Sequence, residues 1–371
     1  MSVIFNGYCR LSLVLISIKG LHTMTAQCLL KMGQSFKLRA ALAIACVVTS
    51  AVAGAGELTI YSSVEGDNLK NFAARFSKAH PDIKINWVRD STGVIQARAI
   101  AEKDNPRHDL FFGHAASNLM TLDAMNLFLP YRPVGVEKLD EKFRDKRDPP
   151  NWTGLWGFGA AICFNTIEAK KKNIPPPEKW DDLTKPIYKG QIVMPNPASS
   201  GTGFLNVSGW LQIMGKDKAW AFMDGLHQNI ASYSHSGSKP CEQAAAGEYV
   251  IGISLPLRGA NLKTMGAPID VIIPTDGIGW EMQGVAIMKT TKNLKDAQTF
   301  VNWSVSESAM DAYAARAEVV AYPVKTPKAQ NLPPELASRM IKNDFAWASE
   351  NQPAILAEWR KRYDGKTEAK K

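Results

Sequence analysis

Strand segments and helical segments alternate along this chain, first near its beginning and again in its middle. The first stretch has strand patterns over residues 57–63, 83–88 and 109–112, with helical patterns over 67–80 and 91–100 between them. Leu69, Phe72 and Phe76 recur at helical spacing, and Pro81 ends that helix. Strands that alternate with helices indicate an α/β domain with a mainly parallel sheet.

The same alternation returns after residue 156. It gives strands over 191–194 and 249–254, helices over 201–214 and 216–227, and then a strand over 279–288 with helical segments near 293–303, 306–317, 334–348 and 353–362. Two connecting segments, near 156–165 and 274–284, are expected to cross between two lobes and form a hinge. We therefore expect an α/β fold of two lobes, each a mainly parallel sheet flanked by helices, divided as 56–160 with 277–371 and as 161–276.

The first 55 residues have the features of an export signal. Lys37 and Arg39 precede an apolar run over 40–48, and small residues follow at 51–55. Neither apolar stretch in this segment reaches the roughly 20 residues that a membrane span requires. We expect residues 1–55 to be an over-extended amino terminus plus a secretory signal peptide, with Met32 just before the signal, and we expect the mature chain to be periplasmic.

The charge of the chain is concentrated in that leading segment. The net charge of +9 includes five basic residues in the first 55 positions, which hold no Asp or Glu, so the rest carries +4. Such a mild excess fits a solvated surface and an anionic ligand. The lysine-rich end over 360–371 lacks an interleaved aromatic stacking platform, so no nucleic-acid partner is expected.

Cysteine and histidine give no sign of a metal centre. Beyond the signal segment only Cys163 and Cys241 remain, and they form either buried thiols or one disulfide. None of the histidines pairs with another at the helical spacing of a metal site, and none has an adjacent Glu as in H-E-x-x-H. We expect no metal and no cofactor.

The segment over 194–204 carries the strongest binding signal. Ser199, Ser200, Gly201 and Thr202 follow a strand and open an amphipathic helix. Free N–H groups at a helix start, together with hydroxyls, form a cradle for an anion, and glycine lets the anion approach the backbone closely. An ordinary Ser/Thr helix cap is the alternative, but three hydroxyls with two glycines favour the anion site.

Three other segments repeat this chemistry at strand ends or helix starts. Their candidate residues are Ser62, Ser63 and Glu65, then Thr92 and Gly93, and then Ser236 and Ser238. Each segment could simply cap its helix. Four such clusters spread over both lobes are better explained by one cleft that binds a small polar anion.

Known enzyme motifs are absent or incomplete. Ser236 and Lys239 match the S-x-x-K of penicillin-interacting serine enzymes, but the chain has neither S-D-N nor K-T-G. It also has no G-x-S-x-G and no Walker P-loop. We expect a protein that is not an enzyme, with a serine hydrolase on Ser236 and Lys239, or a scaffold without a small ligand, as alternatives from other classes.

Four segments together resemble a known family. They are Leu58–Gly66, Asn105–Gly113, Ser199–Gly203 and Gly247–Ser254, and they are similar to extracellular solute-binding proteins of ABC importers, in the branch that includes ferric-ion-binding proteins. The resemblance implies a periplasmic binding protein fold and a monomer that captures a small ligand between its lobes. It also implies a partner, the importer's permease in the inner membrane.

Within this branch, segments 61–67, 197–203 and 235–241 are most similar to 2-aminoethylphosphonate-binding proteins. This resemblance implies that the phosphonate sits on Ser199, Gly201 and Thr202. Thr92, Ser63 and Ser236 would close in from other strand ends. Glu65 is the first choice to pair with the ammonium, with Glu281 and Asp276 as second choices.

The chain departs from the ferric binders where those proteins ligate iron. They carry adjacent tyrosines after the strand that matches 252–254, whereas Leu255, Pro256 and Leu257 follow here. Glu65 stands in place of their histidine ligand, and His114 at about the position of their carboxylate ligand. Without the paired tyrosine oxygens and the carboxylate ligand, these positions would bind ferric iron poorly. A ferric ion or a phosphate ester remains the alternative ligand for the same fold.

Overall fold

The computed structural model describes residues 56–369. The expectations for the signal peptide and for the natural start at Met32 lie outside these residues. Among the helices that are described, none is long and apolar enough to cross a membrane.

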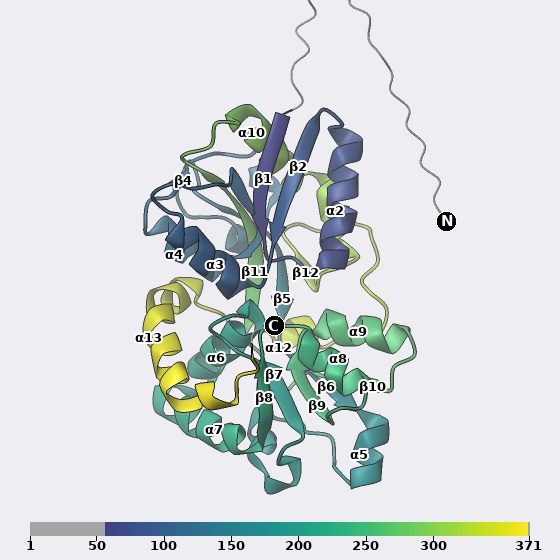
Figure 1. Cartoon of the computed structure of the whole chain (residues 1–371). Helices are drawn as coiled ribbons and strands as arrows, with labels where there is room; N and C mark the ends of the chain where they lie inside the picture. The colour runs from purple at the N-terminus through teal and green to yellow at the C-terminus, as the bar shows by residue number, and fades with distance from the viewer. Residues whose placement is uncertain (1–55, 370–371) are drawn as a thin grey trace, which may run out of the picture. The chain divides into compact units, whose positions relative to one another are not determined.

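The first lobe is built on a mixed sheet whose strand order is β12-β5-β11-β3-β1-β2, with β4 paired to β11 (Figure 1). The strands are β1 (Gly56–Ser62), β2 (Ile83–Arg89), β3 (Leu110–Ala115), β4 (Phe128–Leu129), β5 (Thr153–Gly159), β11 (Trp280–Met288) and β12 (Val319–Val320). β1 runs parallel to β2 and β3, whereas β11 runs antiparallel to β3, β4 and β5.

The second lobe has a five-stranded sheet in the order β10-β6-β9-β7-β8. Its strands are β6 (Ala161–Asn165), β7 (Ile192–Pro195), β8 (Ile230–Ser234), β9 (Ile251–Ser254) and β10 (Ile269–Ile272). β7 runs parallel to β8 and β9, and β6 runs antiparallel to β9 and β10.

Mainly parallel sheets were therefore the wrong expectation for both lobes, and the reason lies in the crossings. Only Ala160 separates β5 in the first sheet from β6 in the second, and residues 273–279 connect β10 to β11. A strand that arrives from the other lobe runs antiparallel to the parallel βαβ strands of the sheet that it joins, as β11 does beside β3 and β6 does beside β9. Gly279 lies in the second crossing, where a Cβ would stand 2.5 Å from the carbonyl oxygen of Leu205.

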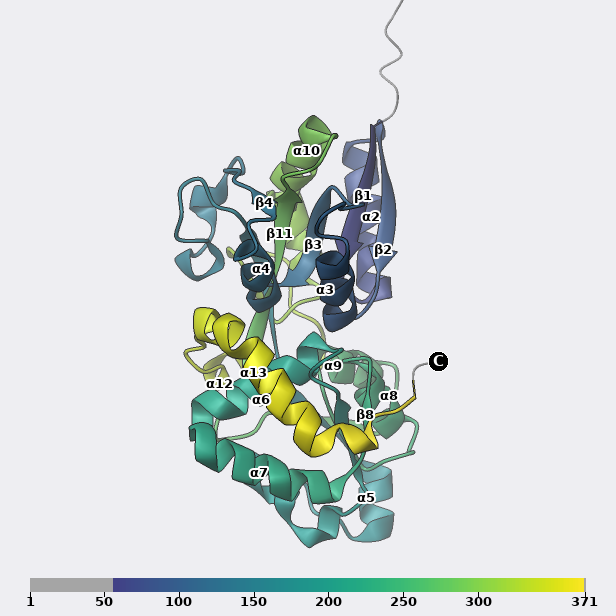
Figure 2. The same cartoon turned by 60° about the vertical axis from the view of Figure 1, so that its left-hand side comes forward.

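Helices flank both sheets (Figures 1 and 2). Those around the first sheet are α2 (Gly66–Ala79), α3 (Thr92–Ala101), α4 (Ala116–Asp123), α10 (Leu294–Ser304) and α11 (Glu307–Ala314). Those around the second are α5 (Thr166–Lys172), α6 (Gly201–Met214), α7 (Lys216–Asn229), α8 (Lys239–Ala245), α9 (Pro256–Thr264), α12 (Leu336–Arg339) and α13 (Phe345–Tyr363). Short 3-10 helices occur at Val136–Lys138, Glu141–Phe143, Trp180–Thr184, Pro186–Tyr188 and Asp364–Lys366.

The carboxy-terminal helix corrects two expectations. Helices over 334–348 and 353–362 were expected, but α13 is one helix with Pro353 inside it, capped at Asp344. Pro353 is exposed, so the backbone hydrogen bond that its missing N–H cannot donate is lost on the solvent side of the helix. Ile355 and Trp359 on the opposite face belong to the second core, so residues 345–363 do not pack into the first lobe alone.

A disulfide joins Cys163 of β6 to Cys241 of α8, with the Cα atoms 5.3 Å apart. Both residues are fully buried in a small cluster of the second lobe. Of the two possibilities that the sequence allowed, buried thiols or one disulfide, the structure has the disulfide.

Candidate ligand-binding cleft

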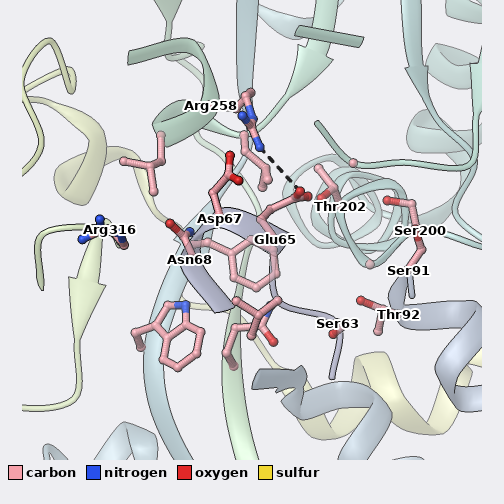
Figure 3. Close-up of a pocket in the computed structure, with 18 of the residues that line it drawn as sticks. Ser63, Glu65, Asp67, Asn68, Ser91, Thr92, Ser200, Thr202, Arg258 and Arg316 are labelled. Carbon is pink, nitrogen blue, oxygen red and sulfur yellow. Dashed lines mark hydrogen bonds and ion pairs between the residues drawn. The ribbon is translucent and has the colours of Figure 1, made fainter. Parts of the chain in front are cut away.

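A cavity lies between the two lobes, at the ends of strands from both sheets (Figure 3). Its first-lobe lining consists of Ser63, Val64, Glu65, Asp67, Asn68, Arg89, Ser91, Thr92, Trp156, Phe158, Gln283, Arg316 and Glu318. Its second-lobe lining consists of Ser200, Gly201, Thr202, Gly237, Leu255, Leu257, Arg258 and Asn261. Strand-end loops of both lobes thus face one another across a single polar cavity.

The start of α6 forms one end of this cavity. Ser200 is the N-cap, and its Oγ accepts a hydrogen bond from the backbone N–H of Gly203 at 3.4 Å. A Cβ on Gly201 would stand 2.7 Å from Oγ1 of Thr92, so glycine is what allows this hydroxyl of the first lobe to come so close. Figure 3 shows Thr92, Ser200 and Thr202 gathered on one side of the cleft. The expected meeting of hydroxyls from both lobes is present here.

Several of the expected residues also bond the lobes to one another. The N–H of Gly93 donates to the carbonyl oxygen of Ser199 at 2.9 Å, and Oγ of Ser238 donates to Oε1 of Glu65 at 3.0 Å. Oγ of Ser91 donates to the carbonyl oxygen of His235 at 3.0 Å. Gly93, Ser199 and Ser238 are absent from the cavity lining, so their contacts serve lobe-to-lobe packing.

Three arginines line the cleft, and sequence reasoning missed all of them. Arg258 and Arg89 each place Nη2 near Oε2 of Glu65, at 3.5 Å and 3.4 Å. Arg316 is in none of the ion pairs described for residues 56–369, and it lies on the side of the cleft away from α6 (Figure 3). Arg89 ends β2 and Arg258 follows β9 by four residues, so their strand-end positions were the signal that could have found them.

Glu65 lies in the cleft, as expected, but its carboxylate already has partners. It accepts from Ser238 and pairs with Arg258 and Arg89. These contacts neutralise much of its charge, so the assignment of an ammonium to Glu65 stays a prediction.

Besides Glu65 and Asp67, a third carboxylate, Glu318, lines the cleft, and it was missed because it looks like an isolated acid in the sequence. Its side chain is 2% exposed, and Oε1 accepts a hydrogen bond from the N–H of Leu257 across the cleft at 3.2 Å. Burial raises the pKa of this carboxyl to about 8. The cavity therefore has three arginines and a buried acid that lies two residues from one of them.

Glu281, Asp276 and His114 lie outside the cavity lining. Glu281 is buried under the first sheet, where it accepts from Ser117 and from the N–H of Met282, and burial raises its pKa to about 7. Asp276 accepts from the N–H of Trp180. His114 is fully buried with Nδ1 3.3 Å from Oγ of Ser63, and burial lowers its pKa to about 3. Glu281 and His114 are buried, whereas Asp276 is exposed away from the cavity, so the structure brings none of these three side chains to the cleft.

Ser62 and Ser236 are also outside the lining. Ser62 accepts from the N–H of Val64 at 3.2 Å, and Ser236 accepts from the N–H groups of Ser238 and Lys239, both at 3.3 Å. Nζ of Lys239 bonds to Glu368 rather than to the Ser236 hydroxyl. These hydroxyls hold their own loops, and the pair has no geometry for a serine nucleophile and its base.

Two α/β lobes joined by crossing strands, with a polar cleft between them, define a two-lobed solute-binding protein. The chain belongs to the family of bacterial extracellular solute-binding proteins, whose model matches residues 105–348. Among the described residues no cluster of three or more His, Cys, Asp or Glu side chains could hold a metal ion.

Curated relatives match most of the chain. An uncharacterized protein of Haemophilus influenzae is 28% identical over 333 residues, covering 86% of this chain and 94% of the relative. A probable ABC transporter periplasmic-binding protein, y4fP of Sinorhizobium fredii, is 28% identical over 296 residues, covering 76% and 78%.

Solved structures of the same fold include a close match. The periplasmic binding protein AfuA of Actinobacillus pleuropneumoniae, with exogenous fructose-6-phosphate bound, superposes with a TM-score of 0.77 at 29% identity, covering 83% of this chain and 99% of that one. The ferric binding protein of Campylobacter jejuni, at 20% identity and a TM-score of 0.67, shares the fold. The two-lobed α/β fold is confirmed. The chain is the periplasmic solute-binding component of an ABC importer, and its family and structural neighbours are binding proteins, not enzymes.

Proposed function

We propose that the cleft captures a small organic anion that carries a phosphonate or phosphate group. The observation that carries this proposal is that one cavity contains both the α6 start, with Ser200, Gly201 and Thr202, and three arginines. A helix start offers free N–H donors and a partial positive charge to an anion. Arginine adds forked donors that match phosphoryl oxygens.

2-Aminoethylphosphonate is the first ligand to test, because the sequence segments around Ser63, Ser200 and Ser236 resemble those of its binding proteins. The alternative is a phosphate ester, favoured by the likeness to a protein with bound fructose-6-phosphate. Both ligands have a phosphoryl group at one end and hydrogen-bond donors at the other. Both would sit with the phosphoryl group at the α6 start, and contacts such as that between Gly93 and Ser199 would form as the lobes close around them.

Calorimetric titration of the mature chain with 2-aminoethylphosphonate, ethylphosphonate, fructose 6-phosphate and inorganic phosphate tests this proposal. At least one organic phosphoryl compound is expected to bind saturably. Thr202→Ala removes a hydroxyl donor worth roughly 1.5 to 3 kcal/mol to a charged acceptor, so every phosphoryl ligand should weaken roughly 10- to 150-fold.

Thr299→Ala is the matched control, because it removes a threonine hydroxyl from α10, away from the cleft, where Oγ1 of Thr299 donates to the carbonyl oxygen of Lys295. It should leave every affinity unchanged. If no phosphoryl compound binds, or if Thr202→Ala binds them as tightly as the control does, the proposed function is wrong.

A further inference from the structure

Two buried acceptor atoms in the cleft have no hydrogen-bond partner among the described residues. They are Oε2 of Glu318 and Oε1 of Gln283, whose side chains are 2% and 8% exposed. A buried polar atom without a partner is costly, and native proteins satisfy nearly all of them. Both residues line the cavity, so the missing donors can come from a molecule bound inside it.

Gln283 and Glu318 lie on opposite sides of strand β5 in the first sheet. Gln283 of β11 and Val320 of β12 both pair with Trp156 of β5, from its two sides, and Glu318 precedes Val320 by two residues. Trp156 lines the cavity as well. The acceptors therefore lie on either side of β5, one on β11 and the other just before β12, and with Trp156 they form the first-lobe floor of the cavity.

The position of Arg316 indicates on which side of the cleft this floor lies. Arg316, two residues before Glu318, is on the side of the cleft opposite to Ser200 and Thr202 (Figure 3). A ligand held by its phosphoryl group at α6 would turn its other end toward this floor. The other charged side chains that line the same cavity are Glu65, Asp67, Arg89, Arg258 and Arg316. Outside the lining, Lys328 lowers the pKa of Glu318 against the larger effect of burial.

We propose that Glu318 and Gln283 form a donor-binding subsite, which accepts hydrogen bonds from an ammonium or hydroxyl group at the end of the ligand far from its phosphoryl group. This inference rests on the proposed function and names the class of substrate: phosphoryl compounds with a hydrogen-bond donor at the other end. Glu65 is the weaker candidate for this role, because Ser238, Arg258 and Arg89 already occupy its oxygens.

Matched pairs of ligands distinguish a loss of binding at the donor-binding subsite from a loss of binding at the start of α6. 2-Aminoethylphosphonate and ethylphosphonate share the phosphonate, and only the first has an ammonium. Glu318→Gln keeps an oxygen to accept from Leu257 and places an amide NH₂ where Oε2 would accept. It should weaken 2-aminoethylphosphonate by about tenfold or more and ethylphosphonate by less than about threefold. Fructose 6-phosphate and inorganic phosphate form the second pair, for a ligand whose donors are hydroxyls.

Two further variants complete the design. Gln283→Met keeps the size of the side chain and removes the acceptor, so it should produce the same selective loss, on a smaller scale. It also provides the test if Glu318→Gln does not fold. Glu65→Gln tests the competing assignment, in which Glu65 binds the ammonium. We expect this variant to affect the two phosphonates equally.

Proton exchange gives an independent readout of the ammonium. Glu318 holds its proton near neutral pH, because its pKa is raised to about 8. An ammonium beside it favours the ionised carboxylate, so binding of 2-aminoethylphosphonate at pH 7 should release close to one proton more from the wild type than from Glu318→Gln. Calorimetry in buffers of different ionisation enthalpy measures this difference.

The outcomes are distinct. If Glu318→Gln and Gln283→Met weaken both members of each ligand pair equally, or neither, the subsite is wrong while the proposed function stands. A selective loss in Glu65→Gln alone would move the ammonium to Glu65 and overturn the inference. If the wild type binds no phosphoryl compound, the proposed function fails, and this inference fails with it.

Discussion

Gly93 lies where the two lobes touch, and replacing it by alanine should hold them apart. A Cβ at this position would stand 2.2 Å from the carbonyl oxygen of Ala198 and 2.9 Å from Cα of Ser199. Both neighbours are backbone atoms of the other lobe, so no side chain can turn away to make room. In a form with separated lobes the same methyl group meets nothing from that loop. Gly93→Ala therefore penalises only the closed form.

The size of the effect follows from two contributions. Overpacking a close contact costs about 1–3 kcal/mol, and the hydrogen bond from Gly93 to Ser199 contributes about 0.5–1.5 kcal/mol. If both fall on the closed form, the sum of about 1.5–4.5 kcal/mol decreases the affinity for a ligand that requires closure roughly 10- to 2,000-fold. Calorimetry of 2-aminoethylphosphonate binding measures the loss, and small-angle scattering compares the lobe separation of the free proteins.

Gly66→Ala is the control for this prediction, since no atom lies within 4 Å of the Cβ that it would add at the start of α2. It should bind as the wild type does. Affinity of Gly93→Ala within about threefold of wild type, with an unchanged scattering profile, would show that the lobes do not close on this contact and would refute the reasoning.

Three other predictions follow from the structure. Reduction of the Cys163–Cys241 disulfide, which closes a loop of sequence separation 78, should lower the free energy of unfolding by about 4 to 5 kcal/mol on the chain-entropy view, measurable by urea titration with and without reductant. Burial raises the pKa of Glu318 to about 8 from its usual 4.5, so the folded state binds more protons than the unfolded one. Stability of the free protein should then fall as pH rises from about 5 to 8, by up to about 5 kcal/mol at this residue, and Glu318→Gln should flatten the decline in pH-dependent melting curves. Ferric citrate should produce no visible charge-transfer band, because Leu255 and Leu257 line the cleft where ferric binders carry tyrosines, and such a band would reject the prediction.

Local signals allowed much of the fold to be predicted from the sequence. The helix expected from Asp67 to before Pro81 is α2, Gly66–Ala79, and the helix expected over 201–214 is α6, Gly201–Met214. In both, an apolar pattern at helical spacing agrees with signals at the helix ends, so tertiary packing had no local preference to override. The proposed anion site at Ser200 and Thr202 rests on the same rule, because a helix start is visible in the sequence.

Features that depend on long-range contacts could not be predicted in this way. The strand pattern of 279–288 reads the same in a parallel or an antiparallel sheet, and only its passage from one lobe to the other sets its direction. Pro353 is the common signal for a helix boundary, yet it lies within α13, because packing of Trp359 and its neighbours maintains the helix beyond it. Glu281 and Glu318 look equally polar in the sequence, and only their burial and neighbours show that Glu318 alone reaches the cleft.

The hydroxyl clusters explain why a sequence can indicate an anion site without identifying its ligand. Some of these residues, such as Ser200 and Thr202, face the cavity, while others, such as Gly93 and Ser238, bond lobe to lobe. Under the proposed function, the α6 start suits any phosphoryl compound, because it binds the group that such ligands share. The proposed donor-binding subsite would then discriminate among those ligands. A change at Glu318 could therefore alter which ligand is bound while the anion cradle and the closing contacts stay the same.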